Sequence, residues 1–154
     1  MVLIAASLLG GCSLHSDPTI EVTGVALNER SDEALAFDVT LQMSNRNNVA
    51  LELLDFDYVF AVDGKRVFHG RRSAEATLGA TSDHMVTIPV VVRYDQVDWQ
   101  QMPPESFEYS LRGHVRYITP GQLAELLDDL GVRRPRAGFA NRGRVIVNDG
   151  DTDG

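Results

Sequence analysis

Alternating apolar and polar residues in the middle of the chain predict β-strands. Apolar side chains or glycine occupy every second position from Leu35 to Met43, from Leu54 to Val62 and from Phe107 to Tyr117. A period of two buries one face of a strand and exposes the other face to water. Residues 22–27 and 84–94 are rich in Val and Thr, which also favour strands.

Two features predict irregular strands. Leu51 and Leu53 lie in the opposite phase to the residues that follow, which indicates a bulge or bend near Leu53. The same interpretation places Leu54 on the buried face of the next segment. Pro89 interrupts the Val-rich run, so we expect that strand at a sheet edge or with its own bulge.

Asp63-Gly64 is a hairpin signal, because glycine tolerates a positive φ. The returning strand is expected over Arg66–His69 and to end at Gly70. Two further short strands are expected, Ser73–Leu78 and Arg144–Val147. Seven or eight short strands with frequent turns predict an all-β fold, an antiparallel β-sandwich.

A single short helix is expected in the C-terminal half. Thr119 can cap it, Pro120 suits its first turn and Gln122 completes a capping box. An apolar stripe at helical spacing follows, made of Leu123, Leu126, Leu127 and Leu130. Gly131 is expected to end the helix. We expect the stripe to cover one end of the sandwich rather than to bind a partner.

The first eleven residues are uncharged and end in small side chains. They are too few for a transmembrane helix, which needs about 20 apolar residues, but they fit the core of a signal peptide. Leu9-Gly10-Gly11-Cys12 resembles a bacterial lipobox, in which the cysteine becomes the lipidated first residue. We therefore expect lipid attachment at Cys12 and a membrane anchor made of its acyl chains.

One departure from the usual signal-peptide pattern qualifies this interpretation. No Lys or Arg precedes the apolar run, so either translation starts further upstream or the segment is not a signal peptide. The alternative is a buried N-terminal strand with an inert thiol. Ser13, where an inner-membrane protein would carry Asp, resembles the signal for export to the outer membrane. The expected location is therefore the outer membrane, facing the periplasm, rather than the inner membrane.

The expected organisation has four parts: a signal peptide over 1–11, a lipidated tether over 12–18, one sandwich domain over 19–147 and a disordered acidic tail over 148–154. A chain of 154 residues has the usual size of one domain. The net charge of −8 argues against a nucleic-acid partner. The single cysteine excludes an internal disulfide and any multi-cysteine metal site.

The order of the motifs resembles a known family. A strand ending in Asn45-Arg46-Asn47 precedes a long strand to Asp63-Gly64, then a strand over Val86–Val92 and the run Tyr109-Ser110-Leu111-Arg112-Gly113. This resembles the WHy (water stress and hypersensitive response) domain of late embryogenesis abundant proteins of the second type. The family pattern has Asn-Pro-Asn where this chain has Asn-Arg-Asn. The asparagines can still close the turn by bonding to their own backbone.

The resemblance covers about residues 20–147 and implies an immunoglobulin-like or fibronectin type III-like sandwich. It also implies a link to desiccation or stress tolerance. Bacterial members resemble envelope lipoproteins, which agrees with Cys12. The turn residues that carry the family motif are Asn45, Asn47, Asp63 and Gly64.

Few residues offer catalytic or metal-binding chemistry. The four histidines, His15, His69, His84 and His114, lack the i, i+4 spacing of a helical zinc site. Asp55, Asp57 and Asp63 share one strand face and could offer paired carboxylates. Their position on the solvent-exposed face of a strand is the simpler explanation for them. Asp149–Gly154 matches the opening of an EF-hand loop without its bidentate Glu, so we expect a solvated tail. We expect no catalysis, no cofactor and no metal.

A short basic cluster, Arg133, Arg134 and Arg136, follows the expected helix, with Arg142 and Arg144 nearby. It could contact anionic lipid headgroups, at about 1 kcal/mol per arginine. Ordinary loop solvation is the favoured interpretation.

The sequence is compatible with three functions. The first is a non-enzymatic, membrane-tethered protein with a protective or chaperone-like role in desiccation or envelope stress. The second is an adaptor or assembly factor that binds an envelope protein through a sheet edge or the leucine stripe. The third is a binder of a small apolar ligand in a cavity lined by Phe37, Phe56 or Tyr58, which a filled core would remove. The expected partners are a membrane, through the lipid, and a client or envelope protein.

Overall fold

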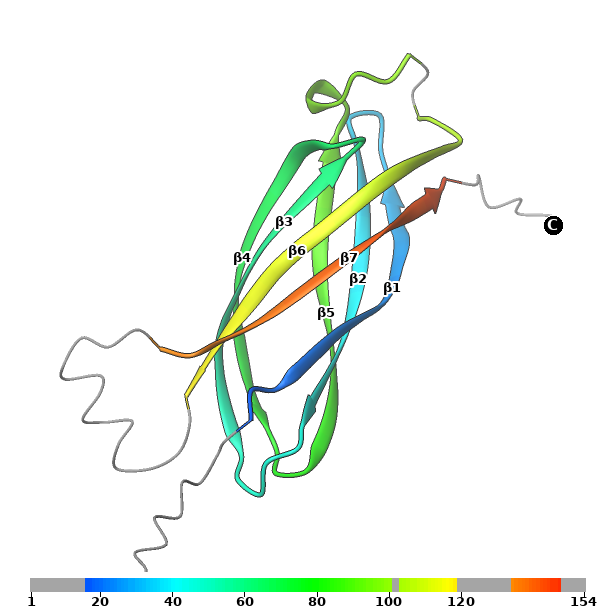
Figure 1. The fold of residues 1–154 in the computed structure, drawn as a ribbon. Helices are drawn as coiled ribbons and strands as arrows, with labels where there is room; N and C mark the ends of the chain where they lie inside the picture. Colours follow the sequence, from blue (N-terminus) through cyan, green and yellow to red (C-terminus); the bar gives the residue numbers. More distant parts are fainter. Residues whose placement is uncertain (1–15, 101–102, 119–133, 148–154) are drawn as a thin grey trace, which may run out of the picture.

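The alternating segments become long strands in the computed structural model, which describes residues 16–100, 103–118 and 134–147. These residues form β1 (Thr19–Arg30), β2 (Ala34–Asn45), β3 (Leu51–Val62), β4 (Lys65–Leu78), β5 (Ser82–Arg93), a 3₁₀ helix η1 (Tyr94–Gln96), β6 (Ser106–Ile118) and β7 (Arg136–Ile146) (Figure 1). The expected helix and its leucine stripe lie outside the described residues.

The seven strands form two antiparallel sheets packed face to face (Figure 1). One sheet has the order β1-β2-β5 and the other the order β4-β3-β6-β7. In an immunoglobulin domain, strands A, B and E lie in one sheet and strands C, F and G in the other. The first, second and fifth strands and the third, sixth and seventh strands follow this division here. The predicted immunoglobulin-like or fibronectin-like sandwich is therefore confirmed.

The core forms where the apolar faces of the two sheets meet. The alternate residues from Leu35 to Met43 on β2 are at most 1% exposed. Phe37 lies between two rings of the opposite sheet, with its ring centre 6.4 Å from that of Phe60 and 5.6 Å from that of Phe107. Burial of each large apolar side chain contributes about 1.5–3 kcal/mol. The alternation therefore predicted the buried faces of β2, β3 and β6, except that Leu54, Tyr109 and Gly113 are only half-buried.

The change of phase at Leu53 is a β-bulge, as predicted. The register between β3 and β4 shifts just after Leu53, and Leu54 is only half-buried instead of joining the buried face. On the partner strand, Glu75 takes a positive φ of 44°. β4 nevertheless continues from Lys65 to Leu78 as one strand. The prediction of two separate strands with an end at Gly70 is therefore wrong.

Gly70 serves close packing rather than strand termination. It lies directly opposite Tyr58 in the β3–β4 register. A Cβ atom at this position would lie 2.3 Å from Cζ of the Tyr58 ring, so only glycine leaves room for the ring. Glycine inside a strand commonly marks such an approach.

One predicted edge strand is confirmed, whereas the last strand is longer than predicted. β5 is an edge strand, as Pro89 predicted. β7 begins at Arg136 rather than at Arg144, and it pairs with β6 along its whole length. Its first half contains Gly138 and small residues, and therefore lacks a recognisable strand pattern.

Candidate functional site

The buried side chain of Asn45 connects two turns at one end of the sandwich through hydrogen bonds. It lies at the end of β2 and is 2% exposed. Its Nδ2 donates to the carbonyls of Val49 and Gly79, both at 2.8 Å, and of Leu78 at 3.3 Å. Its Oδ1 accepts the backbone N–H of Asn47 at 3.0 Å. One buried side chain thus joins the β2–β3 turn to the β4–β5 turn, and the motif closes without the family's proline.

Asn47 connects the start of the described chain to the same end. Its Oδ1 accepts the backbone N–H of Ser16 at 2.9 Å, and its Nδ2 donates to the carbonyl of Ser16 at 2.8 Å. The carbonyl of Asn47 also accepts the backbone N–H of Thr81 at 2.9 Å. Two hydrogen bonds to one residue fix both the position and the direction of the entering chain.

The next two residues add further contacts to the sandwich. The hydroxyl of Tyr117 donates to the carboxylate of Asp17, and Pro18 is buried. Burial of the phenol, together with the neighbouring carboxylate, raises the pKa of Tyr117. Residues 16–18 of the expected tether therefore pack on the sandwich. Cys12 and the lipobox residues Leu9, Gly10 and Gly11 lie outside the described residues.

The second family-motif turn, Asp63-Gly64, lies at the opposite end, between β3 and β4. The φ angles of 47° at Asp63 and 83° at Gly64 are those of a tight hairpin turn. The carboxylate of Asp63 accepts the backbone N–H of Glu108 at 3.2 Å and Nε1–H of Trp99 at 3.3 Å. The predicted hairpin is therefore confirmed. The two motif turns stabilise opposite ends of the sandwich and do not form one site.

The carboxylates on the outer face of β3 are ion-pair partners. Asp55 binds Arg116 through two hydrogen bonds of 2.6 Å, and Arg116 holds the pKa of this carboxyl below its usual range. Asp57 accepts from Arg71 at 2.7 Å and lies 3.0 Å from Nε2 of His69. These bonds also lower the pKa of Asp57. A general acid at neutral pH requires a raised pKa, which neither carboxyl has.

The described histidines lie on three different strands, His69 on β4, His84 on β5 and His114 on β6. His84 is exposed on β5, His114 lies opposite Asp57 in the β3–β6 register, and His15 lies outside the described residues. Within the described ranges, no three His, Cys, Asp or Glu side chains are placed to share a metal ion. The same ranges contain no helix with the length and apolar character needed to cross a membrane.

The three aromatic residues expected to line a ligand cavity belong to the buried core. Phe37, Phe56 and Tyr58 are at most 2% exposed. Tyr58 lies 6.0 Å from the ring centre of Phe68, and Phe37 contacts the rings given above. None of the three side chains is therefore open to the surface, and the small-ligand binder stays a prediction.

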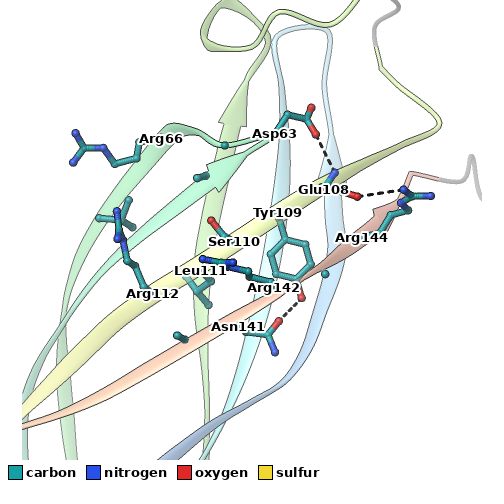
Figure 2. Close-up of a pocket in the computed structure, with 15 residues that line it drawn as sticks. Asp63, Arg66, Glu108, Tyr109, Ser110, Leu111, Arg112, Asn141, Arg142 and Arg144 are labelled. Atoms are coloured by element: carbon teal, nitrogen blue, oxygen red, sulfur yellow. Dashed lines mark hydrogen bonds and ion pairs between the residues drawn. The ribbon is translucent and has the colours of Figure 1, made fainter.

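A hollow of about 790 Å³ lies on the outer face of the four-stranded sheet (Figure 2). Its charged lining consists of Arg66, Arg112, Arg142, Arg144, Asp63 and Glu108. Between them lie small side chains, including Ala61 and Ser110. This surface could not be predicted from the sequence, because its arginines come from three strands whose register a sequence pattern does not reveal.

The basic cluster after the expected helix is only partly described. Arg134 is exposed and Arg136 opens β7 opposite Arg116, whereas Arg133 lies outside the described residues. Arg144 lies near the other end of β7. The structure therefore separates Arg136 from Arg144 along one strand rather than gathering them in one patch.

Comparisons with known proteins agree with this architecture. The family model for late embryogenesis abundant protein (LEA_2) matches residues 40–146. A solution structure from Arabidopsis thaliana, AT1g01470, has a TM-score of 0.64 at 16% identity, covering 92% of this chain and 89% of that chain. A candidate late embryogenesis abundant protein, At2g46140.1, has a TM-score of 0.64 at 12% identity, with coverage of 85% and 71%.

A crystal structure from Archaeoglobus fulgidus has a TM-score of 0.56 at 9% identity, covering 86% of this chain and 97% of that chain. At such low identities these structures show the shared fold alone. A comparison with curated proteins gives no match. The family model, however, spans both motif turns and most of the sandwich. The chain belongs to the late embryogenesis abundant protein family LEA_2.

Proposed function

We propose that this protein is a non-enzymatic, lipid-anchored envelope protein with a WHy-like domain that protects other molecules during desiccation or envelope stress. The family match over residues 40–146 carries the proposal, since membership suggests a stress-related protein. The finer assignment to the WHy form is supported by Asn45 and Asn47. Their side chains close the turn at the position where that form has its asparagine motif.

The proposed lipid anchor is supported by the lipobox and is compatible with the way the chain enters the fold. Ser16 is bonded to Asn47 on the sandwich and lies four positions after Cys12. Four extended residues span about 14 Å at most. A lipid at Cys12 would therefore hold the Asn45 end of the sandwich close to the membrane. Export to the outer membrane, facing the periplasm, rests on Ser13 and remains part of the proposal.

A protective rather than catalytic role is supported by the polar groups on β3. Asp55 and Asp57 are engaged with arginines, and their lowered pKa values suit permanent ion pairs. Folded surfaces of this kind can bind a client without chemical change.

Two experiments test the proposal separately. Globomycin blocks lipoprotein signal processing, so treated cells should accumulate an unprocessed precursor, and a Cys12→Ala variant should show no lipid-dependent membrane fraction. Absence of the precursor would contradict the anchor. In the second experiment, lactate dehydrogenase is dried with the purified sandwich or with an equal mass of lysozyme. The protein should preserve more enzyme activity than lysozyme does, and equal recovery would contradict the protective role.

An adaptor that binds one envelope protein is the second candidate. The observation that favours it is the edge strand β5, on which Met85 is 63% exposed. Edge strands offer unpaired backbone groups to a partner strand. Crosslinking in intact cells separates the two candidates. A single stoichiometric partner would support the adaptor, whereas many weakly crosslinked proteins would support a general protective surface.

A further inference from the structure

The hollow on the outer face of the four-stranded sheet has a regular geometry. Ala61 on β3 lies opposite Ser110 on β6, and these small residues form its floor. Arg66 on β4 lies opposite Ala61, and Arg142 on β7 lies opposite Ser110. The row Arg66–Ala61–Ser110–Arg142 therefore crosses all four strands. Figure 2 shows the two arginines on opposite sides of Ser110.

The spacing across this row follows from sheet geometry. Neighbouring strands lie about 4.8 Å apart, so three steps place the backbones of Arg66 and Arg142 about 14 Å apart. The exposed side chains of Arg66 and Arg142 thus start from the strands on either side of the floor residues. Arg112 adds a third cation in the next row, where it lies opposite Val59 and Ala140.

These three arginines differ from their neighbours in having no acidic partner among the described residues. On the same sheet face, Arg71 pairs with Asp57, Arg116 with Asp55 and Arg144 with Glu108. The other acid at the hollow, Asp63, is engaged by Glu108 N–H and by Trp99. Arg66, Arg112 and Arg142 thus concentrate unneutralised positive charge on a protein whose net charge is −8.

The lining combines this charge with apolar surface from Val59 and Ala61. A polyphosphate would bind the arginines but make no apolar contact, and a flat bilayer would contact the rim of the hollow rather than its floor. An extended polypeptide can bind both the arginines and the apolar floor. Its side chains at i, i+2 and i+4 point the same way, and positions i and i+4 are about 13–14 Å apart. This separation matches the spacing of about 14 Å between the backbones of Arg66 and Arg142.

We infer that this groove, defined by Arg66, Ala61, Ser110, Arg112 and Arg142, binds an extended polypeptide segment with the pattern acidic–x–apolar–x–acidic. The two carboxylates pair with Arg66 and Arg142, and the apolar residue lies over Ala61 and Ser110. Guanidinium groups are suited to carboxylates because they bind them through two parallel hydrogen bonds. The inference rests on the groove alone and does not depend on the proposed protective role or on the lipid anchor.

Fluorescence anisotropy with a labelled peptide containing Glu-Thr-Val-Thr-Glu tests the inference on the purified protein. The matched peptide with Gln in place of both Glu residues is the ligand control. Arg66→Gln and Arg142→Gln should each weaken binding of the acidic peptide about three- to fivefold, and the double variant about tenfold. Arg93→Gln removes an exposed arginine outside the groove and should leave binding unchanged. Binding should also weaken with added NaCl.

A second variant tests the floor without changing charge. Ser110→Tyr fills the groove and should weaken the acidic peptide as much as the double arginine variant does, with unchanged far-ultraviolet circular dichroism. Equal affinity for the acidic and the Gln peptides, or unchanged affinity in the double variant, would overturn the inference. Tighter, arginine-dependent binding of polyphosphate or of phosphatidylglycerol vesicles would overturn the polypeptide as occupant.

Discussion

The hydroxyl of Tyr58 donates a hydrogen bond of 2.7 Å to the carbonyl of Pro89 and so joins the two sheets of the sandwich. Tyr58 belongs to β3, and Pro89 belongs to the edge strand β5 of the other sheet. Proline has no N–H to offer to a strand ladder, but its carbonyl still needs a donor. Burial raises the pKa of Tyr58 to about 12, so the phenol keeps its proton at neutral pH.

Tyr58→Phe should lower the free energy of unfolding by about 1–2 kcal/mol, because it leaves the Pro89 carbonyl without its donor. Tyr94→Phe is the matched control. The hydroxyl of Tyr94 is buried without a hydrogen-bond partner among the described residues, so its removal should be neutral or stabilising. Urea unfolding of both variants measures the difference, and equal losses would contradict the role of the inter-sheet bond.

Gly113→Ala should destabilise the sandwich by about 1–3 kcal/mol, the usual range for overpacking. The new Cβ would lie 2.6 Å from Cζ of Phe139 and 2.7 Å from the backbone oxygen of Asp57, which has little freedom to move. Gly24→Ala is the control, because its Cβ would meet no atom closer than 4.0 Å. Thermal unfolding should separate the two variants clearly, and similar melting temperatures would refute the steric argument.

Asn45→Ala should lower the free energy of unfolding by about 1–3 kcal/mol, because the carbonyls of Val49, Leu78 and Gly79 lose their shared donor. Asn45→Asp should cost more, since it places a carboxylate against those carbonyls. The exposed Asn48 provides the control through Asn48→Ala, which should change little. Guanidinium unfolding gives the comparison. If the Asn45→Ala protein were as stable as the Asn48→Ala protein, the asparagine motif would not stabilise the sandwich.

The Asp55–Arg116 pair predicts a defined pH dependence. The folded pKa of Asp55 lies below its ordinary value of 3.8, so the ionised form is stabilised in the folded state. The resulting stability is present above pH 3.8 and disappears as the pH falls through the folded pKa. Asp55→Asn should therefore be less stable than wild type by about 1 kcal/mol near neutral pH. The difference should shrink in acid.

Unfolding at a series of pH values measures this difference. Asp98→Asn serves as a control, because the Lys65–Asp98 pair is highly exposed and should contribute little. A difference between wild type and Asp55→Asn that stays constant to pH 2, or that grows in acid, would contradict the assigned pair.

Local patterns predicted those parts of the fold that depend on neighbouring residues. The alternation from Leu35 to Met43 identified a buried face, and the phase change at Leu53 identified a bulge, because both follow from the period of a strand. Gly70 was misinterpreted as a strand end. Its actual role depends on the ring of Tyr58, which approaches from the neighbouring strand.

The candidate surfaces depend on partners that lie far apart in the chain. The asparagine motif was recognisable, but the acceptors of Asn45 at Leu78 and Gly79 lie 33 and 34 residues away. Arg66 and Arg142 come together only through the register of four strands. A slip of one residue would turn either side chain to the other face of the sheet, so spacing alone did not indicate the groove.

Survival of cells after drying tests most directly whether the lipid-anchored sandwich protects the envelope. A strain that lacks the gene is complemented with wild type or with Cys12→Ala, and immunoblots confirm equal amounts of protein. Wild type should restore viable counts after drying, and Cys12→Ala should not. Equal survival of both complemented strains, or no loss of survival on deletion, would contradict this protective role.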